Sequence, residues 1–178
     1  MLKKLSLLTL IFFVLAGCAP LERGISETFS DSNIKGQIEY LWFETKKDFY
    51  KNLNITVDQR RVLIVGNVES PQDHIEAIDL AWKADGVLEI IDEIKVGEYS
   101  WGSYTQDAWI SLQIRNAFIF EKGLSSTKFT VFTVEGIVYL LGVASDQREL
   151  DKALTLARTI KGVKAVKSYI RLKNEING

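Results

Sequence analysis

The chain has 178 residues, with 22 basic and 23 acidic side chains, one cysteine and one histidine. A net charge of −1 argues against a nucleic-acid partner, and a single cysteine excludes a disulfide within the chain. Hydrophobic residues make up 47% of the sequence, which is enough for the core of one domain or two small ones.

The chain opens with the pattern of a secretory signal peptide. Two lysines precede a run of apolar residues from Leu5 to Ala16, and small residues follow it. The run is shorter than the roughly 20 residues that a membrane-spanning helix needs. A charged, then apolar, then small-residue order is typical of a signal peptide, so we expect residues 1–17 to be removed.

Cys18 stands where the apolar run ends, in the sequence Leu-Ala-Gly-Cys. This motif resembles the lipobox of bacterial lipoproteins, which implies acylation of Cys18, for example with palmitate, and makes residues 18–30 a lipidated tether. The alternative is a buried thiol. Several acyl chains would anchor the protein stably, whereas one chain gives only marginal binding. Ala19 stands in place of the aspartate of a retention signal, which implies sorting to the outer membrane.

The rest of the chain is a tandem duplication. Residues 107–172 align with residues 31–96 at a constant shift of 76, without a gap. A repeat of this kind is one structural unit made twice. We therefore predict two domains with these bounds, a linker at 97–106 and a tail at 173–178. Because the linker is short, we expect the two domains to pack together.

Each unit predicts the element order α-β-β-α-β. Ile110, Ile114 and Ala117 recur at i, i+4 and i+7, which is the spacing of one helix face. Alternating apolar residues then predict a β-hairpin with its turn at Glu135-Gly136. A helix rich in small residues and a last strand follow. We predict an α+β fold in which two helices cover one face of a small mixed sheet in each copy.

Four glycines and one serine have predicted structural roles. Ser70, followed by proline, predicts the start of the second helix of the first unit. Gly86 and Gly162 are the predicted C-caps of the second helices. Gly66 and Gly142 each end a hairpin strand, and we expect the next helix to pass close to them.

The hairpin glycine, the alanine-rich helix and the Gly-Val pair before the last strand resemble the BON domain. Two copies behind a lipobox resemble the dual-BON lipoproteins of the Gram-negative outer membrane, over essentially the whole mature chain. The resemblance implies a role in outer-membrane integrity without enzymatic activity. It also implies that the first helix of the second domain binds anionic phospholipid. In that family this helix begins with Asp, Trp and Ile, which stand here as Asp107, Trp109 and Ile110.

That helix also carries more large apolar residues than one core face needs. Aromatic residues favour the membrane interface, and exposed apolar patches mark docking sites. The alternative is that Trp109 lies between the domains while Phe118 and Phe120 fill ordinary core. The predicted phospholipid-binding residues are Trp109, Ile110, Arg115, Phe118, Ile119, Phe120, Lys122 and Lys128.

The two units have opposite charge. Residues 31–96 contain eight basic and 13 acidic residues, a net −5, whereas residues 107–172 contain ten and six, a net +4. A cationic second domain is attracted to anionic headgroups. The same asymmetry could instead hold the two domains together. The basic candidates for that interface are Lys161, Lys164, Lys167 and Arg171.

Catalysis has little support in the sequence. His74 is the only histidine and has no cysteine partner, and no metal-ligand spacing or phosphate-binding glycine loop is present. We expect that the protein is not an enzyme and that it has no cofactor and no small-molecule substrate. Two functions remain: a periplasm-facing, lipid-anchored protein that binds anionic phospholipid at the outer membrane, or an adaptor that binds an envelope protein partner and contacts lipid only through its anchor.

Overall fold

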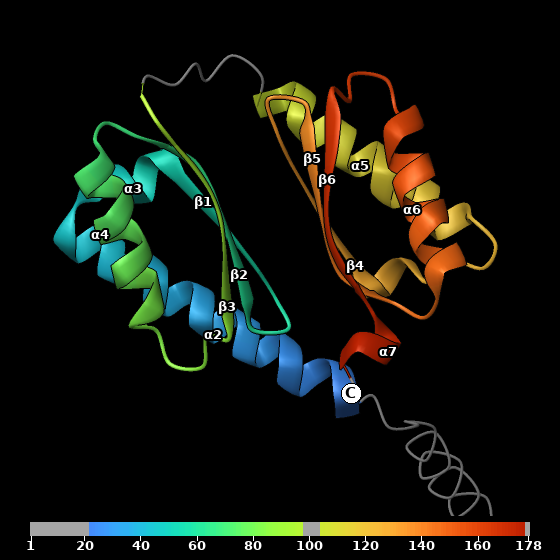
Figure 1. Ribbon diagram of the computed structural model, residues 1–178, viewed down its shortest axis with the longest axis horizontal. Helices are drawn as coiled ribbons and strands as arrows, with labels where there is room; N and C mark the ends of the chain where they lie inside the picture. Colours follow the sequence, from blue (N-terminus) through green and yellow to red (C-terminus); the bar gives the residue numbers. More distant parts are fainter. Residues whose placement is uncertain (1–21, 98–103, 177–178) are drawn as a thin grey trace, which may run out of the picture.

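The computed structural model describes residues 22–97 and 104–176, which form two α+β domains (Figure 1). Cys18 and the predicted signal peptide lie outside the described residues. The elements of the first domain are α2 (Glu22–Thr45), α3 (Lys47–Asn52), β1 (Leu53–Asp58), β2 (Arg61–Val68), α4 (Pro71–Trp82) and β3 (Glu89–Val96). Those of the second are α5 (Tyr104–Phe120), η1 (Ser126–Lys128), β4 (Phe129–Val134), β5 (Ile137–Ala144), α6 (Gln147–Thr159), β6 (Ala165–Leu172) and α7 (Lys173–Ile176).

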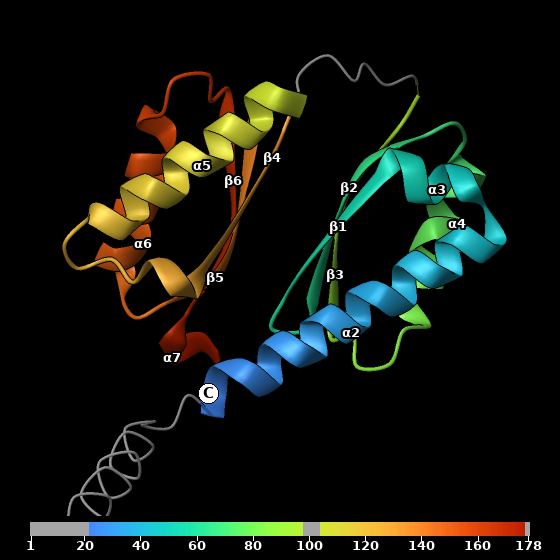
Figure 2. The same cartoon turned by 180° about the vertical axis from the view of Figure 1, so that it is seen from behind.

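The α+β fold predicted from the repeat is confirmed. The structure adds short helical segments and a longer first helix. Each domain inserts a short helical segment, α3 or η1, between its first helix and its hairpin. Helix α2 begins at Glu22, so much of the segment predicted to be a tether is helical. The start of α2 and the short helix α7 lie side by side in both views (Figures 1 and 2).

Both sheets are mixed and have the same topology. In the first sheet, β1 pairs with β2 in antiparallel register and β2 pairs with β3 in parallel register. In the second, β4, β5 and β6 repeat this arrangement. The helices of each domain cover the outer face of its sheet (Figure 1). Apolar residues on those helices fill the core, as Ile34, Ile38 and Trp42 do on α2.

A buried or half-buried aspartate at the start of each domain fixes the hairpin turn. The two turns, at Gln59-Arg60 and Glu135-Gly136, have positive φ at both central residues, as the tight turns that match strand twist require. The carboxylate of Asp107 accepts the backbone N–H groups of Glu135 and Gly136 at 2.7 and 2.8 Å. Asp31 accepts the equivalent N–H groups in the first turn. The family-type aspartate is therefore a structural residue here.

Helix α4 begins as predicted, but both second helices end earlier than predicted. Ser70 accepts the N–H of Asp73 at 3.2 Å and caps α4. The prediction that Gly86 and Gly162 are C-caps is wrong, because Lys83 and Ile160 occupy those positions. The two glycines lie further along, in the turn to the last strand, with φ of +95° and +96°. These positive values are readily adopted only by glycine.

Gly66 and Gly142 contact a different element from the one predicted. Gly142 lies within β5, opposite Phe129 of β4, with φ of +137°. A Cβ atom at this position would overlap the backbone carbonyl of Lys128, and one at Gly66 would overlap that of Asn52. The close neighbour is therefore the backbone that enters the first strand of the same hairpin, and the second helix is not involved.

The inner faces of the two sheets pack against each other and form a third apolar cluster. Its buried members from the first domain are Leu63, Val65 and Ile91, and those from the second are Val134, Tyr139 and Leu141. Under the shift of 76, Leu63 corresponds to Tyr139 and Val65 to Leu141. The two domains thus use equivalent faces, and the expectation that they pack together is confirmed.

Charged residues surround this apolar interface. Glu93 of β3 accepts hydrogen bonds from Lys167 and from the hydroxyl of Tyr169 on β6. Burial and the contact with Glu93 raise the pKa of Tyr169. The buried Arg61 donates to Glu89 and to the Tyr169 carbonyl, both at 2.6 Å. Part of the charge asymmetry between the domains therefore serves their contact.

Candidate functional site

Helix α5 presents a row of large apolar side chains to solvent. Trp109 is 46% exposed, Leu112 53%, Ile119 60% and Phe120 84%. We call these four residues the α5 outer face. Their spacing places them on one side of the helix, and Figure 2 shows α5 on the outer side of the second sheet. Exposed apolar groups that gather in this way are typical of docking surfaces.

Two of the predicted phospholipid-binding residues lie in the core instead. Ile110 is 0% exposed and Phe118 is 1% exposed. The ring of Phe118 packs edge-on against that of Phe129, with centroids 5.8 Å apart. Ile110, Ile114 and Phe118 follow one another at intervals of four, so they share the face that lies against the sheet. The assignment of Ile110 and Phe118 to a lipid contact is therefore wrong.

The alternative interpretation of the aromatic residues is also only partly right. Phe118 does fill ordinary core, but Phe120 does not, because it is largely exposed. Trp109 is 46% exposed on α5, and this helix covers the sheet face opposite to the interface between the domains (Figure 1).

The predicted basic residues differ in their exposure and in their hydrogen-bond partners. Arg115 is exposed and donates to the backbone carbonyl of Val131 at 2.7 Å. Lys122 is exposed just beyond the end of α5. The ammonium group of Lys128 binds the Ser145 hydroxyl at 2.7 Å and the Glu149 carboxylate at 3.4 Å. Arg115 lies on the helix that carries the apolar row and Lys122 follows its end, whereas the ammonium group of Lys128 is engaged at the turn before α6.

Glu149 organises the site that holds Lys128. Burial acts to raise the pKa of this carboxyl, but N–H groups of Ser145 and Ser125 and the charge of Lys128 outweigh it and lower the pKa. The carboxylate therefore stays ionised and fixes the turn before α6. This is a structural task for both Glu149 and Lys128.

Sequence reasoning missed the basic residues of α6 and one apolar residue of α5. Arg148, Lys152 and Arg158 are exposed on α6, which covers the same sheet face as α5 (Figure 1). Lys152 bonds Glu121 at 3.1 Å and the Lys122 carbonyl at 2.5 Å, so it ties α6 to the end of α5. Helical spacing from Trp109 would have found Leu112, three residues on.

The duplicated domain is an internal control for the α5 outer face. The residues of α2 equivalent to Trp109, Leu112 and Phe120 are Asn33, Gly36 and Glu44. The first domain folds around the same pattern of core residues with polar or absent side chains at these positions. The apolar groups of Trp109, Leu112 and Phe120 are therefore not needed by the fold, whereas Ile119 corresponds to Phe43, which is also apolar and exposed.

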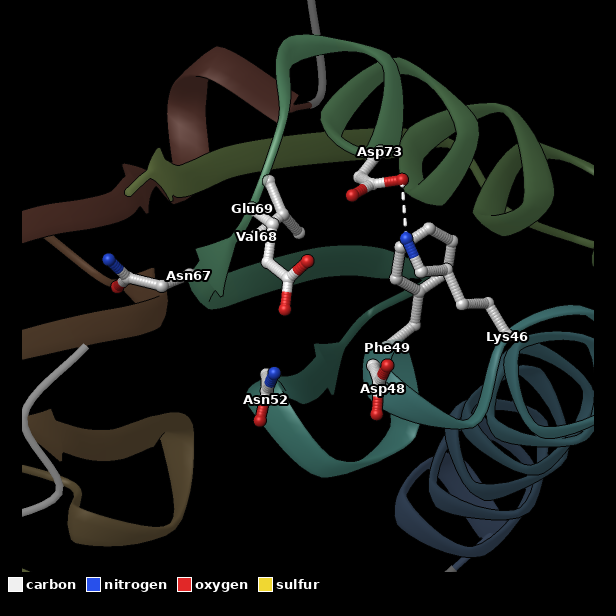
Figure 3. Close-up of a pocket in the computed structure, with 8 residues that line it drawn as sticks. All are labelled: Lys46, Asp48, Phe49, Asn52, Asn67, Val68, Glu69 and Asp73. Carbon is white, nitrogen blue, oxygen red and sulfur yellow. Dashed lines mark hydrogen bonds and ion pairs between the residues drawn. The ribbon is translucent and has the colours of Figure 1, made fainter. Parts of the chain in front are cut away.

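Two hollows of the described structure are poorly suited to a small molecule. The hollow between α3 and α4 in the first domain has an empty volume of about 200 Å³ (Figure 3), below the roughly 300–1,000 Å³ of typical ligand pockets. Lys46 and Asp73 close one side of it with a 2.6 Å ion pair. This hydrogen bond raises the pKa of Lys46 and lowers that of Asp73.

A larger depression of about 1,020 Å³, including open solvent, lies between the end of α5 and the start of α6. Its lining is polar or charged except for Gly123 and Leu124, unlike the mostly apolar walls of small-molecule sites. Within the described residues, three or more potential metal ligands do not cluster anywhere. His74 contacts the Asp92 carboxylate at 2.6 Å.

Residues 22–97 and 104–176 include no helix that is both long and apolar enough to cross a membrane. The fold and the exposed helix define a tandem α+β protein in which the two sheets face inward and the helices form the outer layers. Residues 30–98 and 106–174 each match the model of the BON domain. The chain therefore belongs to the BON domain family, with two copies.

Curated relatives span most of the chain. The protein in the gshII 5′ region of Anaplasma centrale is 35% identical over 127 residues, which cover 70% of this chain and 84% of that protein. The osmotically inducible protein Y of Escherichia coli is 26% identical, covering 84% and 76%. The outer membrane lipoprotein DolP of Haemophilus influenzae is 28% identical, covering 93% of each chain.

Proposed function

We propose that this protein is a non-enzymatic envelope lipoprotein that docks on anionic phospholipid through the α5 outer face and supports outer-membrane integrity. The observation that carries the proposal is the row of exposed apolar residues on α5, from Trp109 to Phe120, in a domain with net charge +4. The similarity over 93% of its length to a protein named as an outer membrane lipoprotein supports an envelope location.

The arrangement combines the two forces that bind a peripheral protein to a membrane. Trp109 and Phe120 offer apolar surface for the boundary between headgroups and acyl chains. Exposed basic residues on the same side, such as Arg115, Lys122 and Arg158, would each contribute about 1 kcal/mol near an anionic surface. Acyl chains on Cys18 would keep this surface at the bilayer, so that even weak docking is effective.

Vesicle flotation tests the proposal. Residues 19–178 contain every described element, and we expect them to float with anionic vesicles but not with zwitterionic ones. Trp109→Glu places a charge in the docking face and should abolish flotation, since a carboxylate resists transfer from water. The control is Phe43→Glu on α2, where Phe43 is 45% exposed; this variant should float as the parent does.

Flotation of Trp109→Glu to the same extent as the parent would remove α5 from the account. Absence of flotation by the parent on anionic vesicles would favour the adaptor function, in which lipid contact comes only from the anchor.

A further inference from the structure

A second exposed apolar surface lies on the first domain, on helix α4. Ile75 is 63% exposed and Trp82 is 50% exposed. They are seven residues apart, which places them on one side of the helix, two turns from each other. Asp79 lies between them and is exposed, as is the neighbouring Glu76. We call these four residues the α4 outer face.

The fold does not require apolar residues at these positions. Under the shift of 76, Ile75 corresponds to Asp151 and Trp82 to Arg158 in α6. Both residues of α6 are charged and exposed, and the second domain packs around the same buried alanines, Ala153 and Ala157, as the first does around Ala77 and Ala81. At most of these positions one domain thus exposes an apolar group where the other domain is polar, and the exception is Ile119, which corresponds to the exposed Phe43.

The charge of this surface differs from that of the α5 outer face. Among the described residues, the carboxylates of Glu76 and Asp79 take part in no ion pair, and the domain as a whole has net charge −5. An anionic membrane would repel such a surface. Basic side chains close to Glu76 and Asp79 would be attracted, and apolar side chains could cover Ile75 and Trp82.

Helix α4 lies on the opposite side of the molecule from α5, so it can bind a different partner. The helices of the two domains form opposite outer layers, with both sheets between them (Figure 1). When the α5 outer face rests on a surface, α4 therefore points away from it. A partner could reach α4 without displacing the second domain.

We propose that the α4 outer face binds a protein partner through a segment of that partner that is both basic and apolar, such as a cationic amphipathic helix. Trp82 and Ile75 would be the apolar anchors, because buried aromatic and aliphatic anchors dominate such contacts. Glu76 and Asp79 would select for basic partners and speed association. This inference concerns a different surface from the lipid-docking face and does not depend on it.

The test uses a synthetic amphipathic helical peptide of leucine and lysine, with a peptide of leucine and glutamate as the charge control. Binding to ¹⁵N-labelled residues 19–178 is followed by amide chemical shifts. We expect the lysine peptide to bind with shifts concentrated on α4, and the glutamate peptide not to bind.

Two variants separate apolar from charge contributions. Ile75→Asp introduces the residue that the second domain has at this position, and we expect it to weaken lysine-peptide binding by about tenfold. A purely electrostatic complex would instead tighten, because the variant adds a negative charge. Glu76→Lys, again the residue of the second domain, should also weaken binding. The matched control is Leu112→Ser on α5, which should bind as the parent does.

Three results would overturn the proposal. The first is a lysine peptide that binds Ile75→Asp as tightly as the parent. The second is self-association of the parent in sedimentation velocity that Ile75→Asp abolishes, since the occupant would then be a second copy. The third is vesicle flotation that Ile75→Asp abolishes, since the occupant would then be lipid.

Discussion

Gly142→Ala is expected to unfold the second domain or to lower its free energy of unfolding by at least about 4 kcal/mol, combining backbone strain with a steric overlap. The backbone φ of +137° is one that residues with a side chain rarely adopt. The new Cβ would overlap the carbonyl oxygen of Lys128, which is backbone and cannot swing aside. Relief would require β4 to move away from β5.

Thermal and urea unfolding, followed by circular dichroism, measures this effect. Gly36→Ala is the control, because Gly36 lies on exposed helix with no atom within 4 Å of the added Cβ. Alanine there should leave stability unchanged or raise it by roughly 0.5–1 kcal/mol. A Gly142→Ala melt that coincides with the parent melt would contradict the geometry of the hairpin.

Phe118→Ala and Phe120→Ala are expected to differ sharply in stability, although the two residues are only two positions apart in α5. Phe118 is 1% exposed and packs on Phe129, so its removal should cost about 3–5 kcal/mol of unfolding free energy. Phe120 is 84% exposed, and truncation there should change stability by less than about 0.5 kcal/mol.

In vesicle binding, the variant that leaves stability almost unchanged is the one that we expect to show a loss. Phe120→Ala should weaken flotation on anionic vesicles, because it removes apolar surface from the α5 outer face. Urea unfolding and flotation of the same samples therefore separate the contribution of Phe118 to stability from the contribution of Phe120 to vesicle binding. Equal unfolding midpoints for the two variants would show that the division of α5 into a core face and an outer face is incorrect.

The repeat made most of the fold predictable from sequence. The shift of 76 aligns residues with the same local role, and the turn predicted at Glu135-Gly136 corresponds to the turn that the structure has at Gln59-Arg60. Alternation and helical spacing then gave the α-β-β-α-β order. The caps at Gly86 and Gly162 were misplaced because a positive φ just beyond a helix is needed in the turn to the next strand as well as in a cap.

The packing of the two sheets against each other was harder to predict from sequence. Residues Val62 to Val65 are all buried, so β2 is apolar on both faces, and sequence alone does not say what covers each face. The tertiary arrangement answers this, since Leu63 and Val65 contact the second sheet. The same arrangement uses Lys167 at the interface and leaves the cations of α6 on the outside, where Lys152 ties α6 to the end of α5.

The candidate site was half predictable. Trp109, Ile119 and Phe120 were correctly expected to lack a place in the core. Ile110 was assigned to lipid contact through a family motif, against its own helical spacing with Ile114. Phe118 follows Ile114 at the same interval of four, so periodicity could have placed it in the core. A motif names residue types, whereas helical geometry decides which of them reach the surface.

The most direct test of the central claim is to locate the membrane on the protein. Residues 19–178, labelled with ¹⁵N, are bound to anionic lipid nanodiscs that carry a spin label in the acyl chains, and the broadening of each amide signal is measured. The account predicts the strongest broadening along α5, near Trp109, Leu112 and Phe120, with α4 unaffected. Broadening centred on α4, or equal broadening over both domains, would contradict it.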